Sequence, residues 1–320
     1  MRLFRILGLV LLVVGSSAWA QVYPDKSKPL KMIVPFGTGT AADVLARALA
    51  RGMTEVSGVT VVVDNKPGAE SVIGVTAAKS SPADGYTFLF TNSGSQVLNV
   101  HMVPQLPYDP VADFVPLVGI AKFTLVLSSG PSQSFKDVKD VIAAARSSPS
   151  KYTYGSATAS TRLAMEMFEH LAGIKLLSVP YKAMSQATTA LVSGEVDFLM
   201  NDAGTVIPHY KTGRLRPLAT TGSSRMQALP DVPTFQEAGV KDYEFTGWFA
   251  TYFPANTPPA IAATMREILL KAVKTKPVVD MLVNASFESM DLSGDQLTSL
   301  QRADVARWAK VVRSSSGPLK

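Results

Sequence analysis

Short apolar segments that resemble strands alternate with helical segments along most of this chain of 320 residues. Near the N-terminal end, the apolar run Leu30–Val34 precedes a segment with helical spacing of apolar residues at Ala41–Val56, and the β-branched run Thr60–Val63 follows. Such alternation is typical of a mostly parallel sheet with helices on both faces. We therefore predict an α/β fold.

The same alternation occurs twice. The first unit continues with a helix at Ile73–Lys79 and a strand at Thr87–Phe90. After Pro131 the second unit has, in order, helix Phe135–Arg146, strand Tyr152–Tyr154, helix Leu163–Leu171, strand Leu177–Val179, helix Gln186–Val192, and strands Val196–Met200 and Leu215–Thr220. Helical spacing returns after Pro258 in the segments Ile261–Val273, Val278–Val283 and Leu297–Val312.

Two apolar stretches lie between the units. Val115–Ser128 and Phe245–Phe253 are each long enough to carry the chain from one unit to the other. We expect one lobe from residues 21–120 and 250–320 and a second lobe from residues 121–249. Two lobes joined by two crossings enclose a cleft that opens and closes by hinge motion.

The first twenty residues have the three parts of a secretory signal. Arg2 and Arg5 precede an apolar core at Ile6–Val14, and Ala18-Trp19-Ala20 has the small residues of a cleavage site. We predict cleavage after Ala20 and a mature protein in the periplasm. The apolar core is too short for a membrane span, and no later stretch has the roughly 20 apolar residues that a spanning helix needs.

Composition excludes several classes of protein. The chain has no cysteine and only three widely spaced histidines, so we expect no metal site, no cofactor and no thiol chemistry. The net charge of +6 is spread along the chain without a run of basic residues among aromatics, so we do not expect nucleic-acid binding.

A glycine-rich turn follows the first expected strand. In VPFGTGTAAD, residues 34–43, the turn residues Gly37, Thr38, Gly39 and Thr40 precede a helix, where free backbone N–H groups and the helix dipole favour an anion. The segment lacks the lysine of a phosphate loop and a complete dinucleotide fingerprint. A tight turn that needs glycine for its backbone alone is the alternative interpretation.

A second turn of this kind follows an expected strand in the other unit. In YGSATASTR, residues 154–162, the hydroxyls of Ser156, Thr158 and Ser160 are placed to cap the next helix or to bind a ligand. Two such turns, one per lobe, would face the same cleft.

Other candidate residues have a binding and a structural interpretation. Arg162 would clamp a carboxylate or stay solvated, and Asn201-Asp202 follows a strand, where it would face a ligand or cap a helix. The aromatic residues Phe36, Tyr181 and Trp248 would line the cleft or belong to the core.

A serine hydrolase is the main catalytic alternative. Ser148-Pro149-Ser150-Lys151 and Lys211-Thr212-Gly213 match two short signatures of penicillin-recognising enzymes. However, Ser148 ends an expected helix instead of opening one, and Lys211-Thr212-Gly213 follows a helical stretch instead of lying on a strand. We therefore expect no enzyme.

Several longer segments resemble the Bug-type periplasmic receptors of tripartite tricarboxylate transporters. They are YPDKSKPLKMIVPFGTGTAADVLAR (23–47), VVVDNKPGAESVIGVTAAKSSPADGYTFLF (61–90), LPYDPVADFVPLVGIA (106–121), YTYGSATAS (152–160), VPYKAMSQATTALVSGEVDFLMND (179–202), GRLRPLATTGSSRMQALPDVPTFQEAG (213–239) and WFATYFPANTPP (248–259). The resemblance implies a two-lobed type II periplasmic-binding-protein fold that closes on a small carboxylate.

The resemblance also implies which residues bind the ligand. The loop Phe36–Thr40 and the turn Tyr154–Ala157 would hold one carboxylate, and the turns at Asn92–Ser95 and Asn201-Asp202 would complete the wall. The chain departs from the family where Thr158, Ala159 and Ser160 replace a glycine-rich stretch and Arg162 falls near a usual histidine. The expected ligand-binding residues are Phe36, Gly37, Thr38, Gly39, Thr40, Asn92, Ser93, Ser95, Ser156, Ala157, Thr158, Ser160, Arg162, Tyr181, Asn201 and Asp202.

The resulting hypothesis is a monomeric, non-enzymatic receptor that delivers a small organic carboxylate to the membrane subunits of a tripartite tricarboxylate-type transporter. A receptor that signals to a sensor kinase and a secreted enzyme acting on a carboxylic acid are the alternatives. The ligand stays open among dicarboxylates, amino acids, aromatic acids and nicotinate-like acids.

Overall fold

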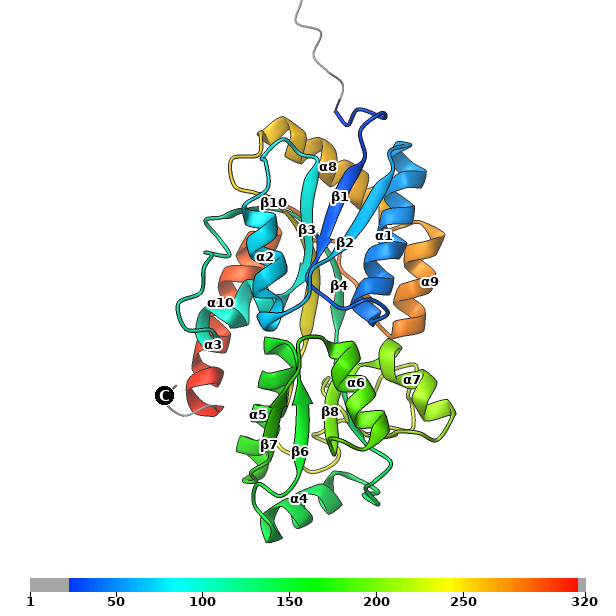
Figure 1. Ribbon diagram of the computed structural model, residues 1–320, viewed down its shortest axis with the longest axis vertical. Coiled ribbons are helices and arrows are strands. Elements are labelled where there is room, and N and C mark those ends of the chain that lie inside the picture. The colour runs from blue at the N-terminus through cyan, green and yellow to red at the C-terminus, as the bar shows by residue number, and fades with distance from the viewer. Residues whose placement is uncertain (1–22, 316–320) are drawn as a thin grey trace, which may run out of the picture.

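The computed structural model describes residues 23–315, so the expected signal peptide and its cleavage site lie outside the described residues. The molecule is elongated and has two lobes, each built on its own sheet (Figure 1). The first lobe contains the six-stranded sheet and the second lobe the five-stranded sheet. The predicted two-lobed α/β fold is therefore confirmed.

The sheet of the first lobe has the strand order β11-β4-β10-β3-β1-β2. Its strands are β1 (Leu30–Val34), β2 (Val61–Asn65), β3 (Thr87–Asn92), β4 (Phe114–Phe123), β10 (Gly247–Pro254) and β11 (Glu288–Ser289). The helices of this lobe are α1 (Ala41–Ser57), α2 (Val72–Lys79), α3 (Asn99–Met102), α8 (Pro259–Ala272), α9 (Lys276–Ala285) and α10 (Asp295–Ser315), with a 3-10 turn at Ala69–Ser71 and a π-helical turn at Gly94–Leu98.

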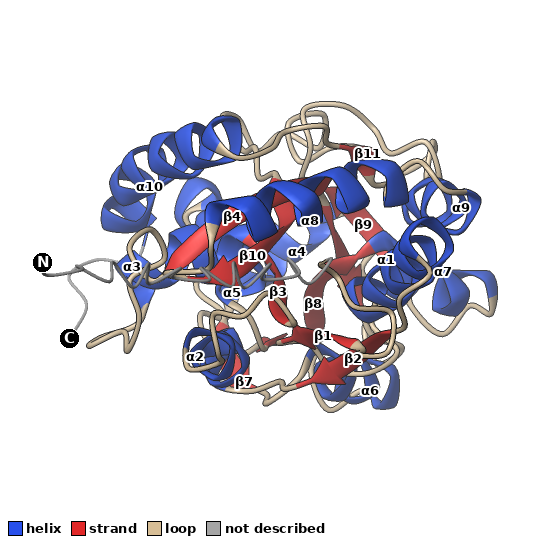
Figure 2. Cartoon of the chain, turned by 90° about the horizontal axis from the view of Figure 1, so that it is seen from above, coloured by secondary structure: helices blue, strands red, loops and turns tan. Residues whose placement is uncertain are grey.

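Helix α1 shows why this region folds as its sequence indicates. The Thr40 side chain caps its N-terminus by accepting a hydrogen bond from the Asp43 backbone N–H, and Gly58 ends it in the left-handed conformation at φ 71°. Leu45, Leu49 and Met53 recur at helical spacing and are fully buried. This buried face packs against α8 and α9 (Figure 2).

The sheet of the second lobe has the order β7-β6-β8-β5-β9. Its strands are β5 (Leu125–Ser129), β6 (Thr153–Ser156), β7 (Leu177–Pro180), β8 (Phe198–Asp202) and β9 (Arg216–Thr220). Its helices are α4 (Val138–Ser147), α5 (Ala159–Ala172), α6 (Met184–Ser193) and α7 (Ala203–Lys211). The C-terminal helix α10 packs both on β4 of the first lobe and on α5 of the second.

Both sheets are mixed, which corrects the expectation of mostly parallel sheets. Strand β1 pairs in parallel with β2 and β3, and β6 pairs in parallel with β7 and β8. Strand β10 runs antiparallel to β3 and β4, and β5 runs antiparallel to β8 and β9. Parallel neighbours need a crossover helix, whereas a strand that enters from the other lobe has its direction set by the crossing.

The two crossings lie side by side and are tied together. The stretch expected as one apolar segment, Val115–Ser128, is two strands separated by Thr124 alone. The Thr221 hydroxyl accepts a hydrogen bond from the Leu125 backbone N–H at 2.7 Å and donates one to the Phe245 carbonyl at 2.8 Å. One side chain thus fixes the spacing of both connections between the lobes.

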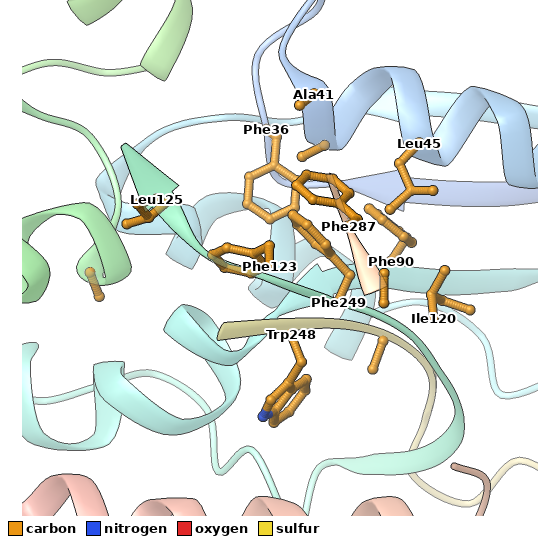
Figure 3. Close-up of a cluster of buried hydrophobic side chains, with 14 of the residues drawn as sticks. Phe36, Ala41, Leu45, Phe90, Ile120, Phe123, Leu125, Trp248, Phe249 and Phe287 are labelled. Atoms are coloured by element: carbon orange, nitrogen blue, oxygen red, sulfur yellow. The ribbon is translucent and has the colours of Figure 1, made fainter. Parts of the chain in front are cut away.

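An aromatic cluster packs beside the crossings (Figure 3). Phe249 on β10 stacks on Phe90 with ring centroids 5.5 Å apart and contacts Phe123 on β4 at 4.7 Å. Phe36, from the loop after β1, meets Phe249 edge to face at 6.0 Å. Phe287 packs against both Phe123 and Phe249. The cluster gives the first lobe a rigid apolar surface where it faces the second lobe.

Candidate ligand site between the lobes

A narrow cavity lies where the loops of the two lobes meet, and the space inside it that admits water-sized molecules is about 30 Å³. A ligand of several carbons therefore enters only when the lobes move apart. The lining of the cavity comes from both lobes: Pro35, Phe36, Gly37, Thr40, Ala42, Pro67, Gly68, Asn92, Phe123 and Phe249 from the first, and Leu125, Ala157, Thr158, Ser160, Thr161, Lys182, Ala183, Met184 and Asp202 from the second.

The glycine-rich turn before α1 forms one wall of the cavity. Thr40 caps the helix, and its hydroxyl also donates to the Gly37 carbonyl at 2.8 Å. A Cβ atom on Gly37 would lie 3.0 Å from Ser185 Oγ and 3.1 Å from Ala183 Cβ, both in the second lobe. Glycine at this position therefore permits the close approach of the two lobes.

The second predicted turn forms the opposite wall. Thr158 and Thr161 make a capping box at the start of α5, with reciprocal bonds between each side chain and the backbone N–H of the other. Ser160, in the first turn of the same helix, is 1% exposed. Within the described chain its Oγ has no hydrogen-bond partner, although it lies in the cavity wall. A buried hydroxyl without a partner costs stability unless another group satisfies it.

Two further helices begin at the cavity. Helix α6 starts at Ala183, which has no side chain able to cap it, and Lys182 and Met184 flank this position in the lining. Helix α7 starts at Asp202, whose side chain makes no capping bond. The N-termini of α1, α5, α6 and α7 thus surround one space. Their first-turn N–H groups and dipoles favour an anion there.

Lys182 and Asp202 are the charged side chains among the lining residues, both in the second lobe. Lys182 is exposed to solvent at the cavity. Desolvation raises the pKa of the Asp202 carboxyl from its ordinary 3.8 to about 7, and a hydrogen bond from its own backbone N–H offsets only part of this rise. The site therefore combines a free cation with a carboxyl that resists ionisation.

The floor of the cavity is apolar and belongs mainly to the first lobe. Phe36, Phe123 and Phe249 line it and are the same side chains that pack in the aromatic cluster of Figure 3. Their mutual packing fixes their positions. A ligand with an anionic end and a carbon skeleton finds both kinds of surface here.

Eight of the expected site residues line the cavity, namely Phe36, Gly37, Thr40, Asn92, Ala157, Thr158, Ser160 and Asp202. The others lie outside it, for different physical reasons. Thr38 and Gly39 are exposed to solvent. Five others have side chains that are hydrogen-bonded to other parts of the protein. The Ser93 hydroxyl accepts from the Trp248 backbone N–H, and the hydroxyls of Ser95 and Ser156 pair with those of Thr91 and Ser178. The Asn201 amide donates to Thr188, and the Tyr181 hydroxyl donates to Glu195.

Arg162 also lies outside the cavity lining, contrary to the expectation that it clamps a ligand. Its guanidinium forms a two-point ion pair with Glu70 of the first lobe, with Nε–Oε1 at 2.8 Å and Nη2–Oε2 at 3.0 Å. Nη2 also donates to the Met102 carbonyl at 3.3 Å. The charge of Arg162 is thus used to join the lobes. Trp248 is buried too, and its indole N–H donates to Asp304 at 2.8 Å.

The sequence analysis missed the α6 start and the apolar floor. Lys182, Ala183 and Met184 follow β7 directly, and a third strand-to-helix junction was a detectable signal. Phe123 and Phe249 lie on crossing strands, where periodicity alone gives no sign of a cavity. Pro67 and Gly68 belong to a turn whose approach to the site depends on the fold.

The structure also bears on the catalytic motifs. Ser148 follows the end of α4, and Lys211-Thr212-Gly213 ends α7 with Gly213 at φ 69°, so neither has the placement of a penicillin-recognising site. Across residues 23–315, no group of three or more His, Asp or Glu side chains has the arrangement of a metal site. Over the same residues no helix is long and apolar enough to cross a membrane.

Comparison with known proteins then identifies the family. A family model described as "Tripartite tricarboxylate transporter family receptor" matches residues 45–316. The chain belongs to this receptor family. BugT of Bordetella pertussis is 31% identical over 324 residues, which cover 100% of this chain and 99% of BugT. A UPF0065 protein of Pseudomonas sp. strain P51 is 32% identical over 311 residues, and the match covers 95% of this chain and 92% of that protein.

Solved receptors of the family have the same architecture. The structure described as R. palustris Rpa4515 with adipate has a TM-score of 0.87 at 30% identity and covers 92% of this chain and 98% of that one. The periplasmic binding protein BugD has a TM-score of 0.87 at 25% identity and covers 92% and 99%. The tripartite tricarboxylate receptors are periplasmic solute-binding proteins, and this chain has their two-lobed fold.

Proposed function

We propose that this receptor binds a small organic carboxylate in the cavity between its lobes and presents it to the membrane subunits of a tripartite tricarboxylate-type transporter. The observation that carries the proposal is the convergence of four helix N-termini, with the unpartnered Ser160 hydroxyl among them, on one cavity. These groups suit an anion that accepts several hydrogen bonds.

The rest of the cavity suits an organic anion better than an inorganic one. The rings of Phe36, Phe123 and Phe249 offer an apolar surface for a carbon skeleton. Lys182 directly precedes the N-cap of α6 and adds a cation to the lining, which favours an acidic ligand. A solved relative of similar fold is described with bound adipate, which supports an organic carboxylate as the ligand.

Contacts between the lobes support a mechanism of closure. The Ala41 backbone N–H of α1 donates to the Thr205 hydroxyl of α7 at 3.0 Å. A Cβ on Gly94 would lie 2.6 Å from Ser160 Oγ, which shows how closely the lobes approach on the other side of the cavity. A ligand that binds both walls favours this approach of the lobes. A partner that contacts both lobes then distinguishes the closed receptor from the open one.

The test is titration calorimetry of the purified mature protein with unbranched mono-, di- and tricarboxylates of two to eight carbons. We expect saturable binding of one acid per chain, and NMR of the recovered acid should show it chemically unchanged. Absence of binding for every acid would refute the proposal. Conversion of the acid would favour the secreted enzyme instead.

A further inference from the structure

Asp202 occupies the N-cap position of helix α7, but its side chain does not cap the helix. It ends β8 and stands at the N-cap of α7, where an aspartate usually accepts a bond from the first turn of the helix. Its carboxylate makes no such bond. Among residues 23–315 its own backbone N–H is the one group that stabilises this carboxylate, since no other residue donates to it or forms an ion pair with it, and the residue lines the ligand cavity.

Within the part of the chain that the structure describes, no cation forms an ion pair with Asp202. Lys182 is the other charged residue in the lining, but it is exposed and forms no ion pair with Asp202. The charge of Arg162 is already paired with Glu70. Burial raises the pKa of Asp202 to about 7, which is the behaviour of a carboxyl that no positive group stabilises.

A ligand can supply what the protein does not. Asp202 is half-buried, so water can reach its carboxylate until a ligand fills the cavity. A carboxylate that loses this water without gaining a donor is unfavourable, and it repels a second carboxylate placed beside it. A hydroxyl or ammonium group on the ligand, next to the carboxylate that the helix N-termini hold, would donate to Asp202. An unsubstituted acid of the same length would leave Asp202 unpaired and would bind less well.

We propose that Asp202 makes the site selective for carboxylates that carry a hydroxyl or ammonium donor over unsubstituted acids of equal length. This inference rests on the proposed function, because it assumes that the cavity holds a carboxylate. Asp202 would bind the hydroxyl or ammonium group of the ligand, whereas the helix N-termini bind only its anionic end.

The experiment measures Kd at about pH 8, where the Asp202 carboxylate is largely ionised. Three series matched in carbon number remove the effect of length: succinate, malate and aspartate; glutarate, 2-hydroxyglutarate and glutamate; adipate, 2-hydroxyadipate and 2-aminoadipate. In the series that fits the cavity, we expect the hydroxyl or ammonium member to bind at least about tenfold more tightly than the unsubstituted acid.

Two substitutions at Asp202 separate the two donors. Asp202→Asn keeps the size and an acceptor oxygen, so the hydroxyl preference should persist while the ammonium preference falls about tenfold. Asp202→Ala should bring all members of a series within about threefold of one another. Lys182→Gln is the matched control, because it changes affinity for diacids in general and should leave the ratio within a series unchanged.

The outcomes are distinguishable. If the unsubstituted acid binds as tightly as its substituted partners in every series, the inference fails while the proposed function stands. If Asp202→Ala keeps the wild-type ratio and a wild-type melting temperature, selectivity comes from elsewhere and the inference also fails. If no acid of any series binds, the proposed function fails and the inference fails with it.

Discussion

The unpartnered hydroxyl of Ser160 gives the sharpest test of the ligand site. Ser160→Ala removes an oxygen that is buried in the cavity wall and bonded to no group in the described chain. Without ligand, the loss of this oxygen removes an unsatisfied polar atom, so the free energy of unfolding should stay equal or rise by up to about 1 kcal/mol. With ligand, the loss removes a donor to a charged group.

The expected loss of affinity follows from that donor. A hydrogen bond to a charged acceptor contributes about 1.5–3 kcal/mol, so Ser160→Ala should weaken carboxylate binding by roughly 10- to 150-fold. Ser156→Ala is the matched control, because Ser156 lies on the same turn, is buried, and bonds Ser178 outside the cavity. It should change Kd by less than about threefold.

Titration calorimetry reports the affinity, and thermal melts without ligand report the stability of the fold. The opposite signs of the two effects are the critical feature. A variant that is destabilised without ligand and binds normally would show that Ser160 serves the fold, and our assignment of the cavity wall would be wrong.

Four further outcomes are expected. A double-mutant cycle on Glu70 and Arg162 should give a coupling energy of about 1 kcal/mol in unfolding, because the half-buried pair joins the lobes; zero coupling would show a pair without energetic effect. Thr221→Val should lower the free energy of unfolding by about 1–3 kcal/mol, since the Leu125 N–H loses its acceptor; a chemical denaturation curve unchanged from wild type would contradict this. The pKa of Asp202 in the fold, about 7, exceeds its ordinary 3.8, so its protonation stabilises the ligand-free fold below about pH 4, and this contribution is lost as the pH rises through 7. Asp202→Asn should therefore flatten the plot of unfolding free energy against pH between these values. Parallel plots for the variant and the wild type would refute the prediction. Intact mass of the periplasmic protein should place its N-terminus at Gln21, and a mass that includes residues 1–20 would not fit.

Much of the fold followed from local sequence patterns. The helix at Ala41–Ser57 was detectable because its cap, its apolar face and its terminal glycine are all local features. The strand-to-helix turns at residues 36–40 and 156–160 were detectable for the same reason, and their junctions do border the cavity. The two apolar crossings at Val115–Ser128 and Phe245–Phe253 indicated two lobes, and the family resemblance specified the type II periplasmic-binding-protein fold.

The tertiary structure decided what each polar or charged group of those turns does. Arg162 is a first-turn cation in the sequence, but Glu70, which is 92 positions away, takes up its charge. Local spacing contains no information on that distance in space. The direction of β5 and β10 is likewise set by the passage between lobes and not by their own residues.

The sequence by itself determined that this chain forms alternating strands and helices whose turns favour an anion, because caps, glycine and apolar spacing act over a few residues. Only the tertiary structure decided that four helix N-termini share one cavity, that aromatic rings of the crossing strands line it, and that no other residue pairs with Asp202 among those described. These properties depend on groups far apart in the chain, which only the packing of two lobes brings together.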